Sequence, residues 1–350
     1  MAWKPLSRLS AGLDLGSYSV KLLARQSGRS AERCWAAEAT IEGALPETSP
    51  PPERVAAAIG RCFSQAGLSL QAIRGITTGI AGPHVVIKQL SLPCLEDREV
   101  DQALRFQAHK HVAFDPQGMV IDYQILGRHR EDRSLEVLLA AVSEDQIERH
   151  LAPLRLLGVD AQILEVTPLA LTNAVIQAGD GNGDARALLD IGYSSSHLTL
   201  YQPEAPYFSR RLDFGGHHLT RAIATARGIS TDEADAWKLT AAASTPEADH
   251  WDGPEWRAML DSLRTDLTAE LRRSLAFYRT IGPLPDPMSL WISGGSARLP
   301  GIADRVSELL GSPVRVFNPM GSLRGEIIGP LQPSDGPQFG QAYGLALRMS

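Results

Sequence analysis

The sequence predicts an α/β fold of two similar lobes, with a small βαββαβ subdomain inserted into the first lobe. Two patterns of strand, glycine turn and strand repeat with the same spacing of polar residues, half a chain apart, which indicates a duplicated unit. A third glycine-rich stretch follows an apolar strand near the C-terminus. The segment between the two turns alternates strands and helices in the order of a separate subdomain.

The first glycine turn carries a set of polar groups that suits a phosphate. Asp14 projects at the end of an apolar strand, and Gly16 lets the backbone turn and approach a ligand closely. Ser17, Ser19 and Lys21 then supply hydroxyl, amide and ammonium donors, with Lys21 as a point charge on the phosphate. The pattern alone also fits an ordinary β-hairpin with a solvated turn.

A second copy of the turn favours the binding function. Asp190, Gly192 and Ser195 repeat the aspartate, glycine and serine of the first turn at one constant offset, and Ser194 adds a further hydroxyl. Two similar turns in a duplicated fold are expected to face one another across a shared cleft. Asp14 and Asp190 would then serve a nucleotide-bound Mg²⁺, through water.

The third stretch completes the set. Gly294, Gly295 and Ser296 follow an apolar strand and precede a helix. Glycines without side chains would let the backbone lie against a flat base or a ribose. A plain loop between a strand and a helix is the structural alternative.

Composition and charge limit the classes of function. The formal net charge of −6 does not favour a nucleic-acid-binding protein, which would carry a basic stripe. Three separated cysteines, Cys34, Cys62 and Cys94, favour a reducing compartment without structural disulfides or a cysteine metal site. No stretch approaches a membrane span, and residues 1–10 lack the apolar core of a signal peptide, so we expect a cytoplasmic protein.

The inserted block is expected to span residues 84–165. The helix after Glu96 carries its apolar residues at helical spacing, and Ser143 with Gln146 opens a second helix as a capping box. The order βαββαβ is typical of a split ferredoxin-like unit. Its expected strands are 85–92, 119–126, 135–142 and 159–166.

The remaining segments are assigned to the two lobes. The first lobe is expected to comprise residues 11–83, 166–180 and a C-terminal helix, 338–350. The second lobe is expected to span 185–337, with one long helix over 256–281. The glycine- and aspartate-rich segment 179–184 marks the boundary between them.

With these three stretches in this order, the chain resembles the actin-like ATPase superfamily, whose fold is a pair of ribonuclease H-like domains. Within it the chain is most similar to the PilM family of type IV pilus assembly proteins, and less similar to FtsA proteins. Residues 97–108, 121–124, 135–142, 313–319 and 339–348 carry the PilM-like pattern.

The resemblance implies ATP and Mg²⁺ as cofactors. The first two turns would bind the phosphates and the third stretch the adenosine. Gly215 and Gly216 would approach the phosphates, while Glu233 and Lys238 would line the base and the ribose. For Glu233 and Lys238 a solvated pair on a helix surface is the alternative.

The resemblance also implies a partner. In the PilM family the inserted block and the adjoining first lobe bind the short cytoplasmic N-terminus of the membrane protein PilN. We therefore expect a PilN-like partner that holds this chain at the inner membrane. The sequence ends at Ser350 without the amphipathic membrane helix of FtsA proteins, which we expect to disfavour direct membrane docking.

The catalytic position predicts weak hydrolysis. Active relatives carry an acidic or amide side chain at the start of the helix that joins the lobes, and here Thr167 precedes Pro168, with Glu165 one strand step away. Threonine is a poor base, so we expect ATP binding with slow or negligible turnover. The alternatives are a polymerising FtsA-like ATPase and a small-molecule kinase of the same superfamily.

Two groups of histidines could suggest a metal site. His109 with His111, and His217 with His218, lack the spacing that places two imidazoles on one helix face beside a third ligand. We expect these histidines to be solvated or packed.

Overall fold

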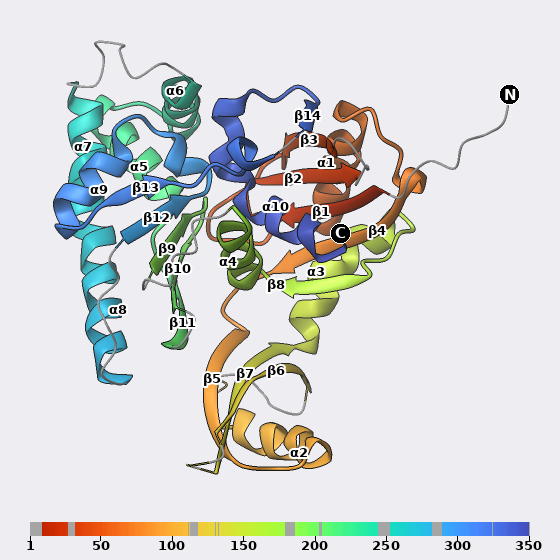
Figure 1. Cartoon of the computed structure of the whole chain (residues 1–350). Coiled ribbons are helices and arrows are strands. Elements are labelled where there is room, and N and C mark those ends of the chain that lie inside the picture. The colour runs from red at the N-terminus through yellow and green to blue at the C-terminus, as the bar shows by residue number, and fades with distance from the viewer. Residues whose placement is uncertain are drawn as a thin grey trace, which may run out of the picture.

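Two β-sheets with the same strand arrangement form the body of the protein (Figure 1). The structure is a computed structural model that describes residues 9–26, 32–110, 112, 118–129, 131, 133–178, 186–202, 205–243, 253–281, 289–323 and 325–349. The predicted boundary segment 179–184 and His111 lie outside these residues.

The first sheet has the strand order β14-β3-β2-β1-β4-β8. Its strands are β1 (Leu9–Leu15), β2 (Ser19–Gln26), β3 (Glu32–Thr40), β4 (Ile73–Ile80), β8 (Ile163–Val166) and β14 (Gly325–Ile328). Strands β1, β2 and β3 form an antiparallel meander, whereas β4 and β8 continue from β1 in parallel.

The second sheet repeats this plan in the order β11-β10-β9-β12-β13. Its strands are β9 (Arg186–Ile191), β10 (Ser196–Gln202), β11 (Ala205–Leu212), β12 (Ser289–Ser293) and β13 (Val314–Val316). Strands β9 to β11 are antiparallel, and β12 and β13 are parallel to β9. The matching order and directions confirm the predicted duplicated α/β fold.

Helices cover both sheets, and two of them lie between the lobes (Figure 1). The helices are α1 (Pro52–Gln65), α2 (Asp97–Ala108), α3 (Glu144–Leu156), α4 (Thr167–Gln177), α5 (Gly216–Arg227), α6 (Thr231–Ala243), α7 (Pro254–Ser262), α8 (Thr268–Ile281), α9 (Ile302–Leu310) and α10 (Gly340–Ala346). One apolar cluster joins α4 and α10 to strands of both sheets, through side chains such as Leu23, Leu188 and Trp291.

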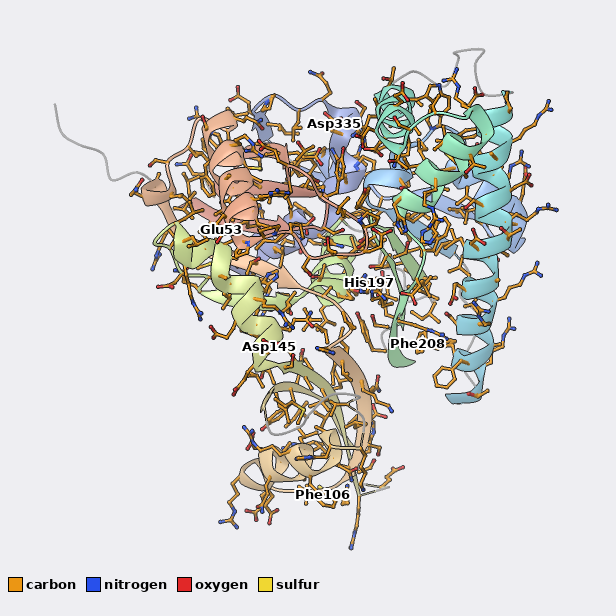
Figure 2. All side chains as sticks on the ribbon, turned by 180° about the vertical axis from the view of Figure 1, so that it is seen from behind. Glu53, Phe106, Asp145, His197, Phe208 and Asp335 are labelled. Carbon is orange, nitrogen blue, oxygen red and sulfur yellow. The ribbon has the colours of Figure 1, made fainter. Side chains whose placement is uncertain are left out.

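The inserted block differs from its prediction. Strands β5 (Val85–Pro93), β6 (Met119–His129) and β7 (Ser134–Ser143) form a three-stranded sheet, which α2 covers on the side away from the lobes (Figure 2). The expected fourth strand, β8, instead pairs with β4 in the first lobe, and α3 packs on α1. The sequence order βαββαβ is present, but α3 and β8 belong to the first lobe because their apolar residues complete its core, as Leu154 does.

Two other expected boundaries also change. Strand β14, expected in the second lobe, pairs in parallel with β3 of the first. The expected helix 256–281 begins at Pro254 and contains a π-helical turn, Leu263–Leu267, between α7 and α8. The expected closing helix is the short α10, which follows a 3₁₀ segment, Pro333–Phe339.

Glycines let α10 lie unusually close to its neighbours. A Cβ at Gly344 would overlap the carbonyl oxygen of Ala170 on α4, and a Cβ at Gly12 on β1 would overlap the carbonyl oxygen of Ala342. These are backbone contacts, which a side-chain rotation cannot relieve. The position of α10 between the lobes is therefore tightly fixed. None of the helices in the described part of the chain has the length and apolarity needed to cross a membrane.

This close packing predicts that adding one methyl group at Gly344 lowers stability. Gly344→Ala should lower the free energy of unfolding by about 2–3 kcal/mol, because α4 and α10 must separate to admit the Cβ. Gly60→Ala is the matched control: Gly60 lies within α1 with no atom near its Cβ position, and its replacement should stabilise by about 0.5–1 kcal/mol. Urea unfolding followed by circular dichroism measures both, and equal effects of the two substitutions would contradict the packing argument.

Candidate functional site

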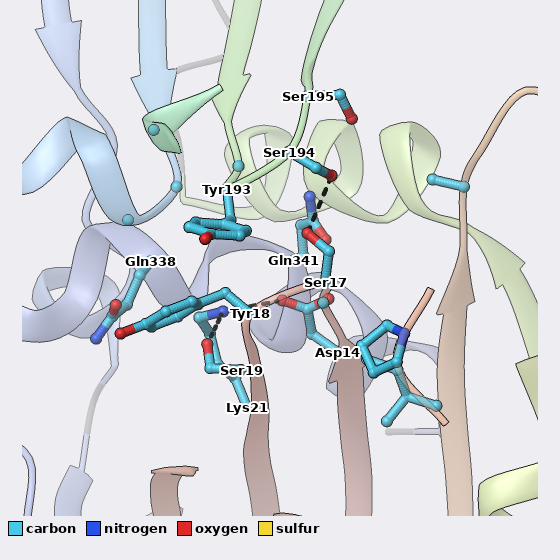
Figure 3. Close-up of a pocket in the computed structure, with 18 of the residues that line it drawn as sticks. Asp14, Ser17, Tyr18, Ser19, Lys21, Tyr193, Ser194, Ser195, Gln338 and Gln341 are labelled. Carbon is cyan, nitrogen blue, oxygen red and sulfur yellow. Dashed lines mark hydrogen bonds and ion pairs between the residues drawn. The ribbon is translucent and has the colours of Figure 1, made fainter. Parts of the chain in front are cut away.

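A cavity of about 1070 Å³ lies between the lobes, where the two glycine turns meet (Figure 3). Most of the sequence-predicted site residues line it: Asp14, Gly16, Ser17, Ser19, Lys21, Asp190, Gly192, Ser194, Ser195, Gly216, Lys238, Gly294, Gly295 and Ser296. The structure thus brings together residues that are far apart in the sequence. Glu233 and Gly215 do not line the cavity.

The two turns have the same internal hydrogen bond. The amide of Gly16 donates to the carbonyl of Ser19 over 3.1 Å, and the amide of Gly192 donates to the carbonyl of Ser195 over 3.1 Å. The turns also project from equivalent strand pairs, β1–β2 and β9–β10. The repeated sequence pattern therefore corresponds to a repeated local structure.

The turns touch one another across the cavity. The Ser17 and Ser194 hydroxyl oxygens are 3.0 Å apart, and the rings of Tyr18 and Tyr193 lie 4.8 Å apart between their centroids (Figure 3). The Tyr18 hydroxyl also donates to Asp235 of α6 over 2.9 Å. A phosphate held between both serines would need to separate them, so this arrangement is a closed one.

Lys21 lies within a cluster of carboxylates. Its ammonium nitrogen is 3.7 Å from the nearest Asp14 oxygen and 3.9 Å from that of Glu38, and it donates to the Ser19 hydroxyl over 3.0 Å. Burial opposes the charge on Lys21, but Asp14, Glu38 and Asp190 more than compensate and raise its pKa. The Lys21 charge is thus paired with protein carboxylates in this structure.

Asp190 lies on the other side of this cluster without a cationic neighbour on its own hairpin. Its partner in strand register is His197, whereas Asp14 faces Lys21. Burial lowers the pKa of His197 to about 4, so this imidazole is neutral at neutral pH. Burial and the Asp14 carboxylate raise the pKa of Asp190 to about 6, against the opposing effects of Lys21, Gln341 and Ser293.

The charges of this cluster fit a divalent cation. Three carboxylates, Asp14, Glu38 and Asp190, surround the single ammonium of Lys21, which leaves a net charge of −2 when all are ionised. Hard oxygen ligands of this kind suit Mg²⁺. Among the described residues, no group of three or more His, Cys, Asp or Glu side chains is arranged to hold a metal ion. Any cation here would therefore need further ligands from phosphate or water.

Lys238 is held by three partners at the wall of the cavity. It donates to the Gly216 carbonyl over 3.1 Å and to the Thr220 hydroxyl over 2.5 Å, and it pairs with Asp235 at 2.8 Å. Burial lowers its pKa, which Asp235 partly counteracts. Lys238 is thus buried and partnered, unlike the solvated alternative.

Two predicted site residues, Gly215 and Glu233, do not line the cavity. Glu233 is exposed and caps its own helix, accepting hydrogen bonds from the Ser230 amide and hydroxyl. Lys238 lies five positions after Glu233, which places the two on different helix faces, whereas Asp235 lies about one turn from Lys238 and takes the inward position. Gly215 instead packs against the second turn, where a Cβ would overlap the Tyr193 carbonyl oxygen.

The backbone conformation of the third stretch, Gly294 to Ser296, requires a glycine at its first position. Gly294 has φ +93°, and a Cβ there would overlap the carbonyl oxygen of Ile191. The backbone of this stretch therefore lies directly against the end of β9. Ser296 is buried nearby, with its hydroxyl 2.7 Å from where a Cβ of Gly216 would lie.

The region expected to position a catalytic water offers a hydroxyl. Thr167 lines the cavity at the start of α4. Glu165 does not line it and forms an ion pair with Arg348 at 2.9 Å. Burial raises the pKa of Glu165, which the Arg348 charge partly offsets. The cavity wall at the start of α4 therefore carries the Thr167 hydroxyl, and the Glu165 carboxylate points elsewhere.

The adjacent histidines His217 and His218 have structural partners. The Gly215 amide donates to Nδ1 of His218 over 3.1 Å, and Nδ1 of His217 lies 3.0 Å from the Tyr193 carbonyl oxygen. These contacts fix the start of α5 beside the second turn, as expected for packed histidines.

Several cavity residues were missed from the sequence. Glu38, Gln338 and Gln341 come from β3 and from the segment before and within α10, and they reach the carboxylate cluster only through the fold. Tyr18 and Tyr193 occupy turn positions at which small residues would be expected near phosphate. Helical spacing from Lys238 is the one signal that could have identified Asp235.

Comparisons with known proteins identify the family. The sequence model of one family, described as "Type IV pilus assembly protein PilM", matches residues 12–350. A solved "PilM-PilN type IV pilus biogenesis complex" is similar over 98% of this chain and 98% of that chain, with a TM-score of 0.79 and 24% identity. Ethanolamine utilization protein EutJ from Carboxydothermus hydrogenoformans is similar over 97% of this chain and 89% of that chain, with a TM-score of 0.57 and 14% identity.

Two more distant matches are one solved structure and one sequence. MreB5 of Spiroplasma citri bound to AMPPNP has a TM-score of 0.50 and 12% identity, over 97% of this chain and 96% of that chain. Cell division protein FtsA of Enterococcus faecalis (strain ATCC 700802 / V583) is 23% identical over 177 residues, which are 46% of this chain and 40% of that protein. The match thus spans less than half the length of FtsA. The structural matches to the PilM–PilN complex, EutJ and MreB5 confirm the actin-like ATPase fold.

The buried Asp190 predicts a pH-dependent cost to stability. Because its folded pKa of about 6 lies above the unfolded value, ionisation in the folded state destabilises the protein by up to about 3 kcal/mol at pH 8. Asp190→Asn should therefore raise the melting temperature at pH 8. The gain should shrink as pH falls below about 6 and become small near pH 4, close to the ordinary aspartate pKa of 3.8.

An exposed aspartate, Asp101, provides the control that distinguishes the effect of burial at Asp190 from the effect of removing any negative charge. Asp101→Asn on α2 removes a solvated carboxylate that pairs with Arg105 and should change stability by less than about 0.5 kcal/mol. Scanning calorimetry between pH 4 and pH 8 measures both variants. A gain for Asp190→Asn that is constant across this range would contradict the assigned ionisation.

Proposed function

Because the chain belongs to the PilM family of type IV pilus assembly proteins, we propose that it binds Mg-ATP between its lobes and captures the N-terminal peptide of a PilN-like membrane protein. The observation that carries the proposal is the pair of matching turns that face one another across the cavity, beside a cluster of three carboxylates. The partner is proposed because a solved structure similar to this chain is a PilM–PilN complex.

Different cavity residues would contact the phosphates, the cation and the nucleoside of a bound nucleotide. Backbone amides of the two turns and the hydroxyls of Ser17 and Ser194 would bind phosphate oxygens. Asp14 and Asp190 would hold the Mg²⁺, which when bound neutralises phosphate charge. Gly294 and the neighbouring residues Gly295, Ser296 and Lys238 would lie beside the nucleoside. The turns must separate to admit the phosphates, so binding would couple to movement of the lobes.

The peptide would occupy the part of the cavity nearest the inserted sheet. Gly82 and His84 on the connection from β4 to β5, with Gln146, Arg149 and His150 on α3, line this part. It is continuous with the phosphate end of the same cavity, so nucleotide and peptide would influence one another's binding. Attachment to the membrane partner would hold the protein in the cytoplasm at the inner membrane.

Peptide binding tests the assembly role. A synthetic peptide with the cytoplasmic N-terminal sequence of the PilN-like protein from the same genome should bind saturably in a pull-down or by fluorescence anisotropy. Arg149→Glu should weaken binding at least about tenfold, because it reverses a charge at the cavity wall. Arg155→Glu is the control, since Arg155 is on the same helix and does not line the cavity.

Peptide binding should be measured both with and without Mg-ATP. The absence of peptide binding in both conditions, with folded protein, would contradict the assembly role and would favour a filament-forming or divergent actin-like function.

Turnover tests the assignment of Thr167. Multiple-turnover phosphate release should be slow, because threonine is a poor base and the nearby carboxylate of Glu165 pairs with Arg348 instead. Glu165→Gln should leave this slow rate unchanged. Rapid phosphate release that Asp190→Ala abolishes would show instead that this cavity is an efficient ATPase site.

A further inference from the structure

Two glutamines from one segment reach carboxylates of both lobes. The side-chain amide of Gln338 donates to Glu38 of the first sheet over 2.8 Å. One helical turn later, the side-chain amide of Gln341 donates to Asp190 of the second sheet. Both glutamines line the cavity, and Figure 3 shows them beside the two turns. A single chain segment therefore touches the acidic cluster from both sides.

This segment is held rigidly against the second lobe. The Pro337 carbonyl accepts hydrogen bonds from the Ser293 hydroxyl and from the Gly294 amide, each over 3.0 Å. Gly340 lies so close to Ser293 that a Cβ would be 2.6 Å from the hydroxyl oxygen. Gln341 thus begins from a fixed backbone, which limits the positions that its amide can take.

An amide donor holds a carboxylate without cancelling its charge. In the first lobe, Asp14 faces Lys21, and this ammonium neutralises part of the cluster. In the second lobe, the equivalent position in strand register is His197, and the neutral side chain of Gln341 donates to Asp190. The cluster therefore keeps a negative charge on the Asp190 side while the carboxylate orientation is set.

We propose that Gln341 is a positioning residue that orients the Asp190 carboxylate toward a nucleotide-bound divalent cation. The seating of α10 between the lobes and the binding of the cation would then depend on one another. This inference rests on the proposed binding of Mg-ATP. Residues that orient a metal ligand commonly contribute tenfold to a hundredfold to metal affinity.

The variant Gln341→Met tests the donor. Methionine has a similar length and no amide, so Mg²⁺ affinity, titrated at saturating ATP, should fall by about tenfold. Affinity for ATP measured in EDTA should stay within about twofold of wild type, because Asp190 would not then serve a cation. A merely structural contact would lower both affinities or neither. Isothermal titration calorimetry measures the affinities for Mg²⁺ and for ATP. Binding of a fluorescent ATP analogue is a second, independent readout.

The variant Gln341→Lys separates orientation from charge. Lysine can still donate to Asp190 but adds a positive charge, so Mg²⁺ affinity should fall at least as far as in Gln341→Met, while ATP affinity in EDTA should hold or rise. Restoration of wild-type Mg²⁺ affinity by lysine would overturn the argument. Gln102→Met, at an exposed position on α2, is the control for substitution of a glutamine.

The outcomes distinguish this inference from the proposed function. Wild-type protein that binds ATP equally with Mg²⁺ and with EDTA would contradict the proposed cation site itself. Wild-type protein with Mg²⁺-dependent binding, combined with unchanged Mg²⁺ affinity in either folded Gln341 variant, would contradict the positioning role alone. Circular dichroism identifies which variants fold, and one folded variant is sufficient for the test.

Discussion

The structure depends on a cluster of buried like charges at the junction of its two lobes. Asp14, Glu38 and Asp190 share one ammonium, that of Lys21, in a region largely shielded from water. Buried carboxylates that repel one another destabilise a fold unless a cation or hydrogen-bond donors compensate. Hydroxyl and amide donors supply part of this compensation, and a divalent cation would supply the rest. In the proposed function, the same arrangement that costs stability would create affinity for a metal-bound phosphate.

The backbone around this cluster is arranged to hold it in place. The two sheets repeat one strand plan, so each lobe presents its turn at the same edge. Helices α4 and α10 lie between the sheets, and Gly12 and Gly344 let their backbones come into direct contact with their neighbours. Gln341 extends from this fixed helix to Asp190. Movement of the lobes would therefore change the position of Gln341 relative to the Asp190 carboxylate.

Repeated local patterns could be predicted from the sequence, whereas long-range partners could not. The aspartate, glycine and serine of each turn share one spacing, and the structure gives both turns the same hydrogen bond. By contrast, Glu38 and Gln338 are 300 residues apart in the sequence, and no local pattern predicts that they meet. Glu233, expected beside the base and the ribose, is exposed and caps its own helix, a contact that its residue type did not distinguish from the predicted one. Strand β8 was assigned to the inserted block because strand order alone does not specify which sheet edge a strand joins.

The central claim is that the cavity between the lobes, with its carboxylate cluster, binds a nucleotide together with a divalent cation. Isothermal titration calorimetry of ATP against wild-type protein, once with Mg²⁺ and once with EDTA, tests it most directly. The account predicts clear saturable binding with Mg²⁺, and binding at least about tenfold weaker in EDTA, because the uncompensated carboxylates repel the phosphates. Equal affinity in both conditions, or no binding by the folded protein in either, would contradict it.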